Sequence, residues 1–147
     1  MFQGIAGINL DAKGRLSIPT KHRQPLTSGK NKKLVLTSHP HRCLLVYPSE
    51  AWDPIREQIM KFSSFDPQLS LWKRLLVGFA EEMSLDGAGR ISISQSQRDF
   101  AGLDKRVMLV GQGSHFELWS EMSWNKQIAV FDDGSSNMPP GLENFAL

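Results

Sequence analysis

A nine-residue segment near the start of the chain occurs a second time, and this internal repeat constrains the fold more than any other feature. Residues 10–18 read LDAKGRLSI and residues 85–93, 75 positions later, read LDGAGRISI, with six of the nine positions identical. The similarity continues through the aligned pairs Leu45 with Leu118 and Trp52 with Trp124. The chain therefore consists of two copies of one unit of about 45 residues.

Each copy is predicted to form a β-hairpin around this segment. In the first copy, apolar residues at 8 and 10 before the turn, and at 16 and 18 after it, follow the period of two that a half-buried strand requires. An aspartate at the first turn position and a glycine at the fourth suit a type I turn that ends in a residue of positive φ. Asp11 and Arg15 fall on the face opposite the apolar side chains, as do Asp86 and Arg90. Each pair can therefore meet in solvent.

A second hairpin and a short helix are predicted in each copy. The hairpin strands are 33–38 with 43–47, and 106–110 with 116–119. Ser94 is a suitable N-cap for a helix that ends at Gly102, whereas Pro25 limits the equivalent helix of the first copy to about one turn.

Two further helices are predicted between the copies. Asp53-Pro54 and Asp66-Pro67 both resemble an N-cap followed by proline at the first helical position, which predicts helices over 54–62 and 67–79. The second helix carries an apolar stripe that suits a core or a subunit interface: Leu69, Trp72, Leu75, Leu76 and Phe79. The segment 132–140 is rich in Gly, Ser, Asn and Pro, and it is expected to be disordered.

The predicted fold class is α+β, mainly β. A unit of about 45 residues is near the lower limit for an independent core, so the two copies are expected to pack about a pseudo-two-fold axis into one small barrel. The expected divisions are a first repeat at 5–52, a helical connector at 53–80, a second repeat at 81–124, and a C-terminal helix with a flexible tail at 125–147.

Charge is distributed unevenly between the copies. The net charge is only +2, but residues 1–52 carry eight Lys and Arg against two Asp and Glu, whereas residues 81–124 carry four against seven. The first copy is thus a basic module, which favours an anionic partner for that part of the surface.

The turn arginines are the strongest candidates for contact with DNA. A capped turn requires Asp and Gly but not Arg, and an arginine presents a planar fork that suits phosphate or guanine edges. The first copy adds positive charge at Lys13, Lys21, His22 and Arg23, whereas the second copy has Ala88, Gln95 and Gln97 at the places taken to match. Arg90 is therefore expected to be a weaker contact or a structural residue.

Metal binding and catalysis have weaker support. His39, His41 and Cys43 alternate on a predicted hairpin tip, but the spacing matches no recognised zinc pattern, so a solvated tip is the preferred interpretation. Ser17 and Ser92 lack the glycine elbow of a nucleophile. We expect no enzyme activity, no metal and no cofactor.

A cytoplasmic protein that associates with the nucleoid is expected. The longest run without a polar side chain is short of the roughly 20 residues that cross a bilayer. The first ten residues lack the features of a signal peptide, and a single cysteine forms no intrachain disulfide.

The order of these motifs resembles the MraZ family of the AbrB/SpoVT swapped-hairpin superfamily. The resemblance covers about residues 1–124. It rests on these segments: Met1-Phe2-x-Gly4, the two Asp-x-x-Gly-Arg motifs, Cys43 to Pro48, and Arg74 to Gly78. It implies interlocked SpoVT-AbrB repeats in one barrel, ring-shaped homo-oligomers, and DNA-facing roles for Asp11, Arg15, Asp86 and Arg90.

The function that the resemblance implies is sequence-specific transcriptional regulation. Members of the family bind direct repeats in the promoter of the division and cell-wall gene cluster, and usually repress their own operon. Lys13, Lys21 and Arg23 are expected to contact phosphates, while Arg15 contacts a base edge or supports that contact. The alternative is a protein-interaction scaffold, or an antitoxin-like partner, that uses the same barrel.

Overall fold

The two copies are interlocked through their strands rather than packed as separate units. The computed structural model describes residues 1–134 and 137–146. The first copy contains β1 (Ile5–Asn9), β2 (Arg15–Ser17), α1 (Thr20–Leu26), β3 (Leu34–His39) and β4 (Cys43–Pro48). The second contains β5 (Glu81–Met83), β6 (Arg90–Ser92), α4 (Gln95–Ala101), β7 (Arg106–Gly111) and β8 (Phe116–Ser120). Between them lie α2 (Ser49–Met60), α3 (Pro67–Lys73) and a π-helix (Arg74–Gly78), and α5 (Glu121–Ala129) follows the second copy.

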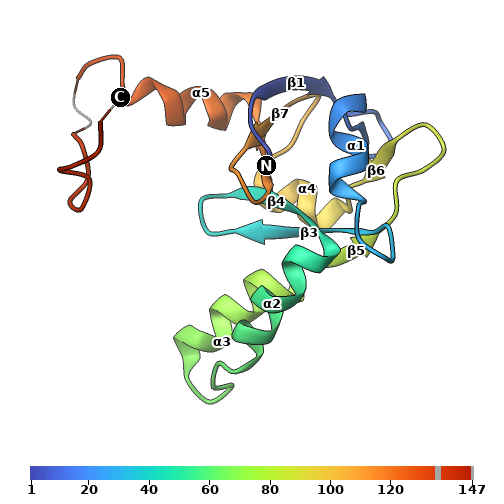
Figure 1. Cartoon of the computed structure of the whole chain (residues 1–147), viewed down its shortest axis with the longest axis horizontal. Helices are drawn as coiled ribbons and strands as arrows, with labels where there is room; N and C mark the ends of the chain where they lie inside the picture. Colours follow the sequence, from blue (N-terminus) through green and yellow to red (C-terminus); the bar gives the residue numbers. More distant parts are fainter. Residues whose placement is uncertain (135–136, 147) are drawn as a thin grey trace.

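Strand order shows the pseudo-two-fold relation directly. A six-stranded sheet runs β1-β7-β8-β4-β3-β5 and a separate ribbon pairs β2 with β6, with every pairing antiparallel. The counterparts in the two copies are β1 and β5, β3 and β7, and β4 and β8. If each strand is replaced by its counterpart, the same order results, read from the other end of the sheet. The α+β fold of two tandem repeats is therefore confirmed, with one large sheet and one small ribbon. Figure 1 shows α5 on one side of the strands, with α2 and α3 together on another side.

The prediction that the two strands flanking each repeat turn pair with each other is wrong. Among residues 1–134 and 137–146, a single bridge, between Leu10 and Leu16, joins the segments on either side of the first turn. Beyond that bridge, β1 pairs with β7 and β2 pairs with β6, so both strands take partners from the other copy. A strand of three residues cannot bury its apolar face alone, and pairing across the copies places that face in a shared core.

One hydrophobic core contains side chains of both copies. Leu16 and Ile18 of the first copy, and Ile91 and Ile93 of the second, are at most 2% exposed. They pack against apolar side chains of the large sheet, which include Leu36, Leu44, Leu109 and Leu118. The opposite face of β3 and β4 is covered by α2 and the π-helix, through Trp52, Ile59, Leu76 and Val77.

The register of the sheet corrects one of the aligned pairs. Leu34 opposes Pro48 and its counterpart Val107 opposes Ser120, so Pro48 matches Ser120. Leu118 therefore matches Val46 rather than Leu45. Leu45 packs beneath α2 on the opposite face of the sheet from Leu118.

Two helix predictions that depended on proline are also wrong. Helix α1 is as long as α4 despite Pro25, because proline at the sixth helical position removes only the bond to the Lys21 carbonyl in the last turn. Helix α2 begins at Ser49, directly after β4, so Pro54 lies inside it rather than at its start. The boundary expected at 52/53 falls within α2, and the one expected at 124/125 falls within α5.

Other helix signals are confirmed. Asp66 caps α3 by accepting hydrogen bonds from Gln68 N and Leu69 N, with Pro67 at the first position. Ser94 and Gln97 form a capping box on α4, which ends at Gly102 with a φ of 61°. The tail predicted to be disordered includes residues 135 and 136, which lie outside the described residues.

The predicted helix over 67–79 changes geometry along its length. After Lys73 it continues as the π-helix, whose freed carbonyls find partners on β3. Thr37 Oγ1 donates to Leu76 O at 2.6 Å, and Ser38 Oγ donates to Leu75 O at 2.6 Å. The apolar stripe on this helix divides accordingly: Leu76 packs in the core, while Trp72 stays 45% exposed.

Candidate nucleic-acid interface

The two repeat turns have the geometry that their sequence predicts. Gly14 and Gly89 take φ values of 79° and 75°, which favour glycine over any residue with a Cβ. Asp11 Oδ1 accepts hydrogen bonds from the backbone N–H groups of Lys13 and Arg15 at 2.9 and 2.8 Å. Asp86 Oδ1 accepts the equivalent bonds, both at 2.9 Å. Both turns are therefore rigid and nearly identical in structure.

In each turn the second carboxylate oxygen holds the arginine. Arg15 Nε donates to Asp11 Oδ2 at 2.7 Å, and Arg90 Nε donates to Asp86 Oδ2 at 2.8 Å. The arginine side chains remain 34% and 33% exposed. Within the described part of the chain, the terminal nitrogens of both guanidinium groups have no partner. Each arginine is thus fixed through Nε and presents its two terminal nitrogens, with four N–H donors, to solvent.

The backbone amides also set the charge state of the two aspartates. The N–H of Arg15 is the largest cause that lowers the pKa of Asp11, and the N–H of Arg90 does the same for Asp86. Both carboxylates are therefore ionised throughout the neutral range.

Pairing of β2 with β6 brings the two arginines together, which sequence reasoning did not foresee. Arg15 opposes Ser92, and Ser17 opposes Arg90. Since Leu16 and Ile91 point into the core, all four of these polar side chains lie on the outward face of the ribbon. The two arginines are diagonal neighbours there, and such residues lie roughly 7–8 Å apart.

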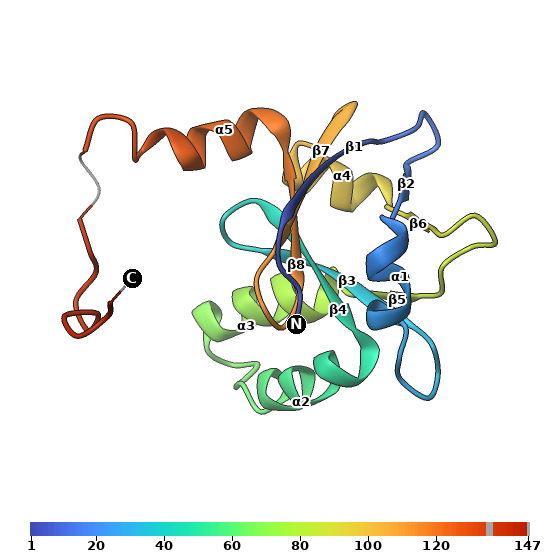
Figure 2. The same cartoon turned by 45° about the horizontal axis from the view of Figure 1, so that its top comes forward.

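Both turns project on the same side of the molecule. Figure 2 shows the blue turn before β2 and the yellow-green turn before β6 on the side away from α5.

Two acidic residues, Glu81 and Glu82, line the same shallow depression as Arg15 and Arg90. Glu82 is held there by Ser49 Oγ at 2.8 Å and lies 3.6 Å from Lys33 Nζ.

The basic residues that flank the first turn differ in how free they are. Lys13 and Lys21 are exposed, and neither forms an ion pair among the described residues. His22 packs edge-on against Phe116 at a centroid distance of 4.7 Å, and burial lowers its pKa. The Nε of Arg23 donates to Ile18 O at 2.8 Å. The cations beside the first turn that have no partner among the described residues are therefore Lys13 and Lys21. Because its pKa is lowered, His22 is neutral at pH 7.

The first residues of α1 and α4 show that the helix residues of the two copies were matched incorrectly from the sequence. Helix α1 begins at Thr20 and α4 begins at Gln95, so Lys21 matches Ser96 and Arg23 matches Arg98. The second copy thus lacks both lysines but keeps the helix arginine. Arg98 was not among the residues predicted from the motifs, although the offset of 75 residues between the copies places it opposite Arg23.

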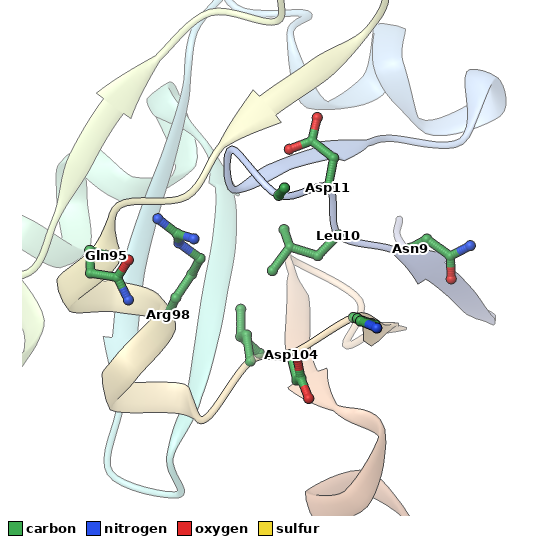
Figure 3. Close-up of a pocket in the computed structure, with 9 residues that line it drawn as sticks. Asn9, Leu10, Asp11, Gln95, Arg98 and Asp104 are labelled. Carbon is green, nitrogen blue, oxygen red and sulfur yellow. The ribbon is translucent and has the colours of Figure 1, made fainter.

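A cavity of about 570 Å³ lies beside the first turn. Figure 3 shows Leu10 and Asp11 on one side of it, with Arg98 and Gln95 on the side of α4. Arg98 reaches from α4 toward the turn. The cavity is thus lined by residues of the first turn and by residues of the second copy's helix.

The hairpin tip with His39 and His41 has no metal-binding geometry. Cys43 is buried, and no group of three potential ligands clusters anywhere in residues 1–134 and 137–146. The two histidine rings instead pack edge-on at 4.5 Å. No helix within these same residues has the length and apolar character needed to cross a bilayer.

Comparison with known proteins also divides the chain into two similar halves. The family described as "MraZ protein, putative antitoxin-like" matches the chain twice, over residues 1–75 and 76–140. A protein of Methylobacillus flagellatus named "Transcriptional regulator MraZ" is 56% identical over 148 residues and covers the full length of both chains. Proteins of the same name from Azoarcus sp. and Thiobacillus denitrificans are 55% and 41% identical, also over their full length. Because one family matches both halves and full-length relatives share this identity, the chain belongs to the MraZ family.

Proposed function

We propose that this protein is a sequence-specific DNA-binding transcriptional regulator that represses its own division and cell-wall gene cluster by binding direct repeats in the promoter. It acts in the cytoplasm, on the nucleoid, and has no catalytic role. The observation that carries the proposal is the outward face of the β2–β6 ribbon. There Arg15 and Arg90 lie side by side, each fixed by an aspartate through Nε and each with its terminal nitrogens free.

This arrangement suits recognition of a base edge. The two terminal nitrogens of an arginine match the O6 and N7 acceptors of guanine, and a two-stranded ribbon fits the major groove. Asp11 holds the guanidinium of Arg15 in one orientation before DNA arrives, which reduces the entropy lost on binding. Lys13 and Lys21 are free to contact phosphates on either side, and such contacts fix the register.

We further propose that several copies of the chain form a ring that binds repeated boxes together. One protomer offers few cationic contacts, whereas linked copies gain affinity through effective concentration. Large apolar side chains on two helical regions remain exposed and suit contact with neighbouring protomers. They are Phe65 before α3, Leu71 and Trp72 on α3, and Met122, Ile128 and Phe131 on or next to α5.

The test is a gel shift with the DNA directly upstream of the protein's own gene. Arg15→Ala is expected to abolish the shift while circular dichroism and the oligomer size stay unchanged. One lost bidentate contact is worth about 1–3 kcal/mol per box, and several boxes multiply the effect. Ser17→Ala is the matched control, because Ser17 lies outward on the same strand and its hydroxyl forms no hydrogen bond with the residues that the structure describes. Binding by a folded Arg15→Ala ring at the native level would refute the assignment.

Arg90→Ala is expected to weaken binding less than Arg15→Ala. The two turns have the same internal bonds, but Ala88 and Ser96 replace Lys13 and Lys21 beside the second one. Fewer phosphate contacts therefore hold the second turn on DNA. Equal losses for the two variants would contradict this dominance of the first copy.

Salt dependence separates DNA binding from the scaffold or antitoxin-like alternative. Release of counterions makes the logarithm of the affinity fall with the logarithm of salt concentration, by about 0.9 per phosphate contacted. Lys13→Ala and Lys21→Ala are each expected to reduce that slope by about one. Absence of both a shift and a slope would favour a protein partner instead.

A further inference from the structure

The glycine of each repeat turn is covered by an arginine from the other copy. A Cβ on Gly14 would lie 2.9 Å from Cζ and from Nε of Arg98, which belongs to α4. A Cβ on Gly89 would overlap the guanidinium of Arg23, which belongs to α1. The two arginines are counterparts at an offset of 75, so the crossed contact occurs twice.

Backbone hydrogen bonds dock the same two glycines onto the opposite copy. Ile93 N donates to Gly14 O at 2.8 Å, and Ile18 N donates to Gly89 O at 3.0 Å. Each turn is thus held by a strand end and by a helix arginine that both belong to the other copy. The bonds within each turn fix its own shape, whereas these contacts with the opposite copy fix where the turn lies on the rest of the fold.

We propose that Arg23 and Arg98 are positioning residues that hold the DNA-reading turns across the copies. Arg98 of the second copy positions the turn that carries Arg15, and Arg23 of the first copy positions the turn that carries Arg90. The effect on DNA binding rests on the proposed function, whereas the positioning itself does not. Arg23, whose position beside the basic turn suggests a phosphate contact, acts in this proposal through Gly89.

The two contacts differ in their hydrogen bonding. Arg23 Nε donates to Ile18 O, the carbonyl that directly precedes Pro19 in its own copy. Arg98 Nε is buried and has no hydrogen-bond partner among the described residues. Arg98 therefore holds the first turn by packing alone, beside the cavity that Figure 3 shows.

Amide hydrogen exchange of the full-length protein tests the crossed arrangement without DNA. Arg98→Ala is expected to accelerate exchange of the Gly14, Arg15 and Ile93 amides by about tenfold, and to leave Gly89 and Arg90 unchanged. Arg23→Ala is expected to give the opposite pattern, with the Ile18 amide affected. Lys105→Ala is the matched control, since Lys105 lines the same cavity and carries the same charge but is not among the atoms nearest Gly14.

The outcomes of this experiment are distinct. Equal acceleration at both turns, or acceleration at the turn of the same copy, would overturn the proposal, because a general loss of stability affects both turns. Arg98→Lys and Arg23→Lys serve if an alanine variant fails to fold. They keep the charge but remove the planar group over the glycine, so the same crossed pattern is expected in weaker form.

DNA binding provides the second measurement. Arg23→Ala is expected to reduce affinity for the promoter repeats by about fivefold while the slope of affinity against salt stays unchanged. A slope reduced by about 0.9 would instead show that Arg23 contacts a phosphate, and would overturn its positioning role. If Arg15→Ala binds DNA normally, the proposed DNA site fails, yet the exchange pattern still decides whether the arginines hold the turns.

Discussion

Gln97 is expected to be a main determinant of stability, although it resembles an ordinary surface glutamine in the sequence. Its side chain is fully buried in α4. Nε2 donates to Leu36 O on β3 at 3.0 Å and to Phe79 O after the π-helix at 2.9 Å. Oε1 accepts from Ser94 N at 3.4 Å. One side chain thus joins a helix, the central sheet and the end of the connector.

Gln97→Ala leaves these two carbonyls without a side-chain donor in the interior. A buried acceptor that loses its partner costs about 1–3 kcal/mol. The Leu36 carbonyl is the more deeply buried of the two, so we expect a total loss of about 2–4 kcal/mol in the free energy of unfolding. For a chain of this length, that corresponds to a melting temperature lower by roughly 5–12 °C.

Urea and thermal unfolding, followed by circular dichroism, measure this loss. Gln97→Met keeps most of the volume and removes the donors, so it separates hydrogen bonding from the cavity and is expected to be nearly as destabilising. Gln95→Ala is the control on the same helix, because its bond to Asp99 is exposed, and it is expected to change stability by less than about 0.5 kcal/mol. If Gln97→Ala lowers the free energy of unfolding no more than Gln95→Ala does, the buried hydrogen bonds of Gln97 do not contribute to stability as predicted.

Two further predictions concern the connector and the turns. Thr37→Val keeps the shape of a fully buried side chain but removes the donor to Leu76 O, so it is expected to cost about 1–3 kcal/mol in urea unfolding; an unchanged midpoint would show that the π-helix does not need this bond. The lowered pKa values of Asp11 and Asp86 mean that their contribution to stability is fully present above the unfolded value of about 3.9 and is lost only as pH falls through the lower folded values. Carboxyl NMR titrations are expected to give midpoints below 3.9 for both residues, and a midpoint at or above it for either would contradict the observed backbone bonds.

The features that were predictable from sequence are those set by a few neighbouring residues. Asp11, Gly14 and Arg15 specify the turn, its cap and its ion pair within five positions of the chain. Asp66-Pro67 and Ser94 specify helix starts in the same way. Such interactions form between groups that are close in the chain, so they do not depend on the remaining fold.

Features that depend on partners far along the chain were not predictable in this way. The period of two around Leu16 indicates a strand but not its partner, which proved to be β6 rather than the neighbouring β1. The alignment of Leu45 with Leu118 was wrong by one residue, and in a strand this error exchanges the two faces. Prolines 25 and 54 indicated helix limits, but packing of Leu26 and Trp52 in the interior outweighs one lost hydrogen bond each.

The sequence by itself determined that the chain has two copies of one unit, each with a capped turn that carries an aspartate and an arginine. It also determined which copy has the additional lysines. Only the tertiary structure decided that Arg15 and Arg90 share one face, and that Arg98 and Arg23 cover the turns of the opposite copies. The reason is physical: a short strand and a tight turn have too little apolar surface to be stable alone, so their partners are chosen by the shared core.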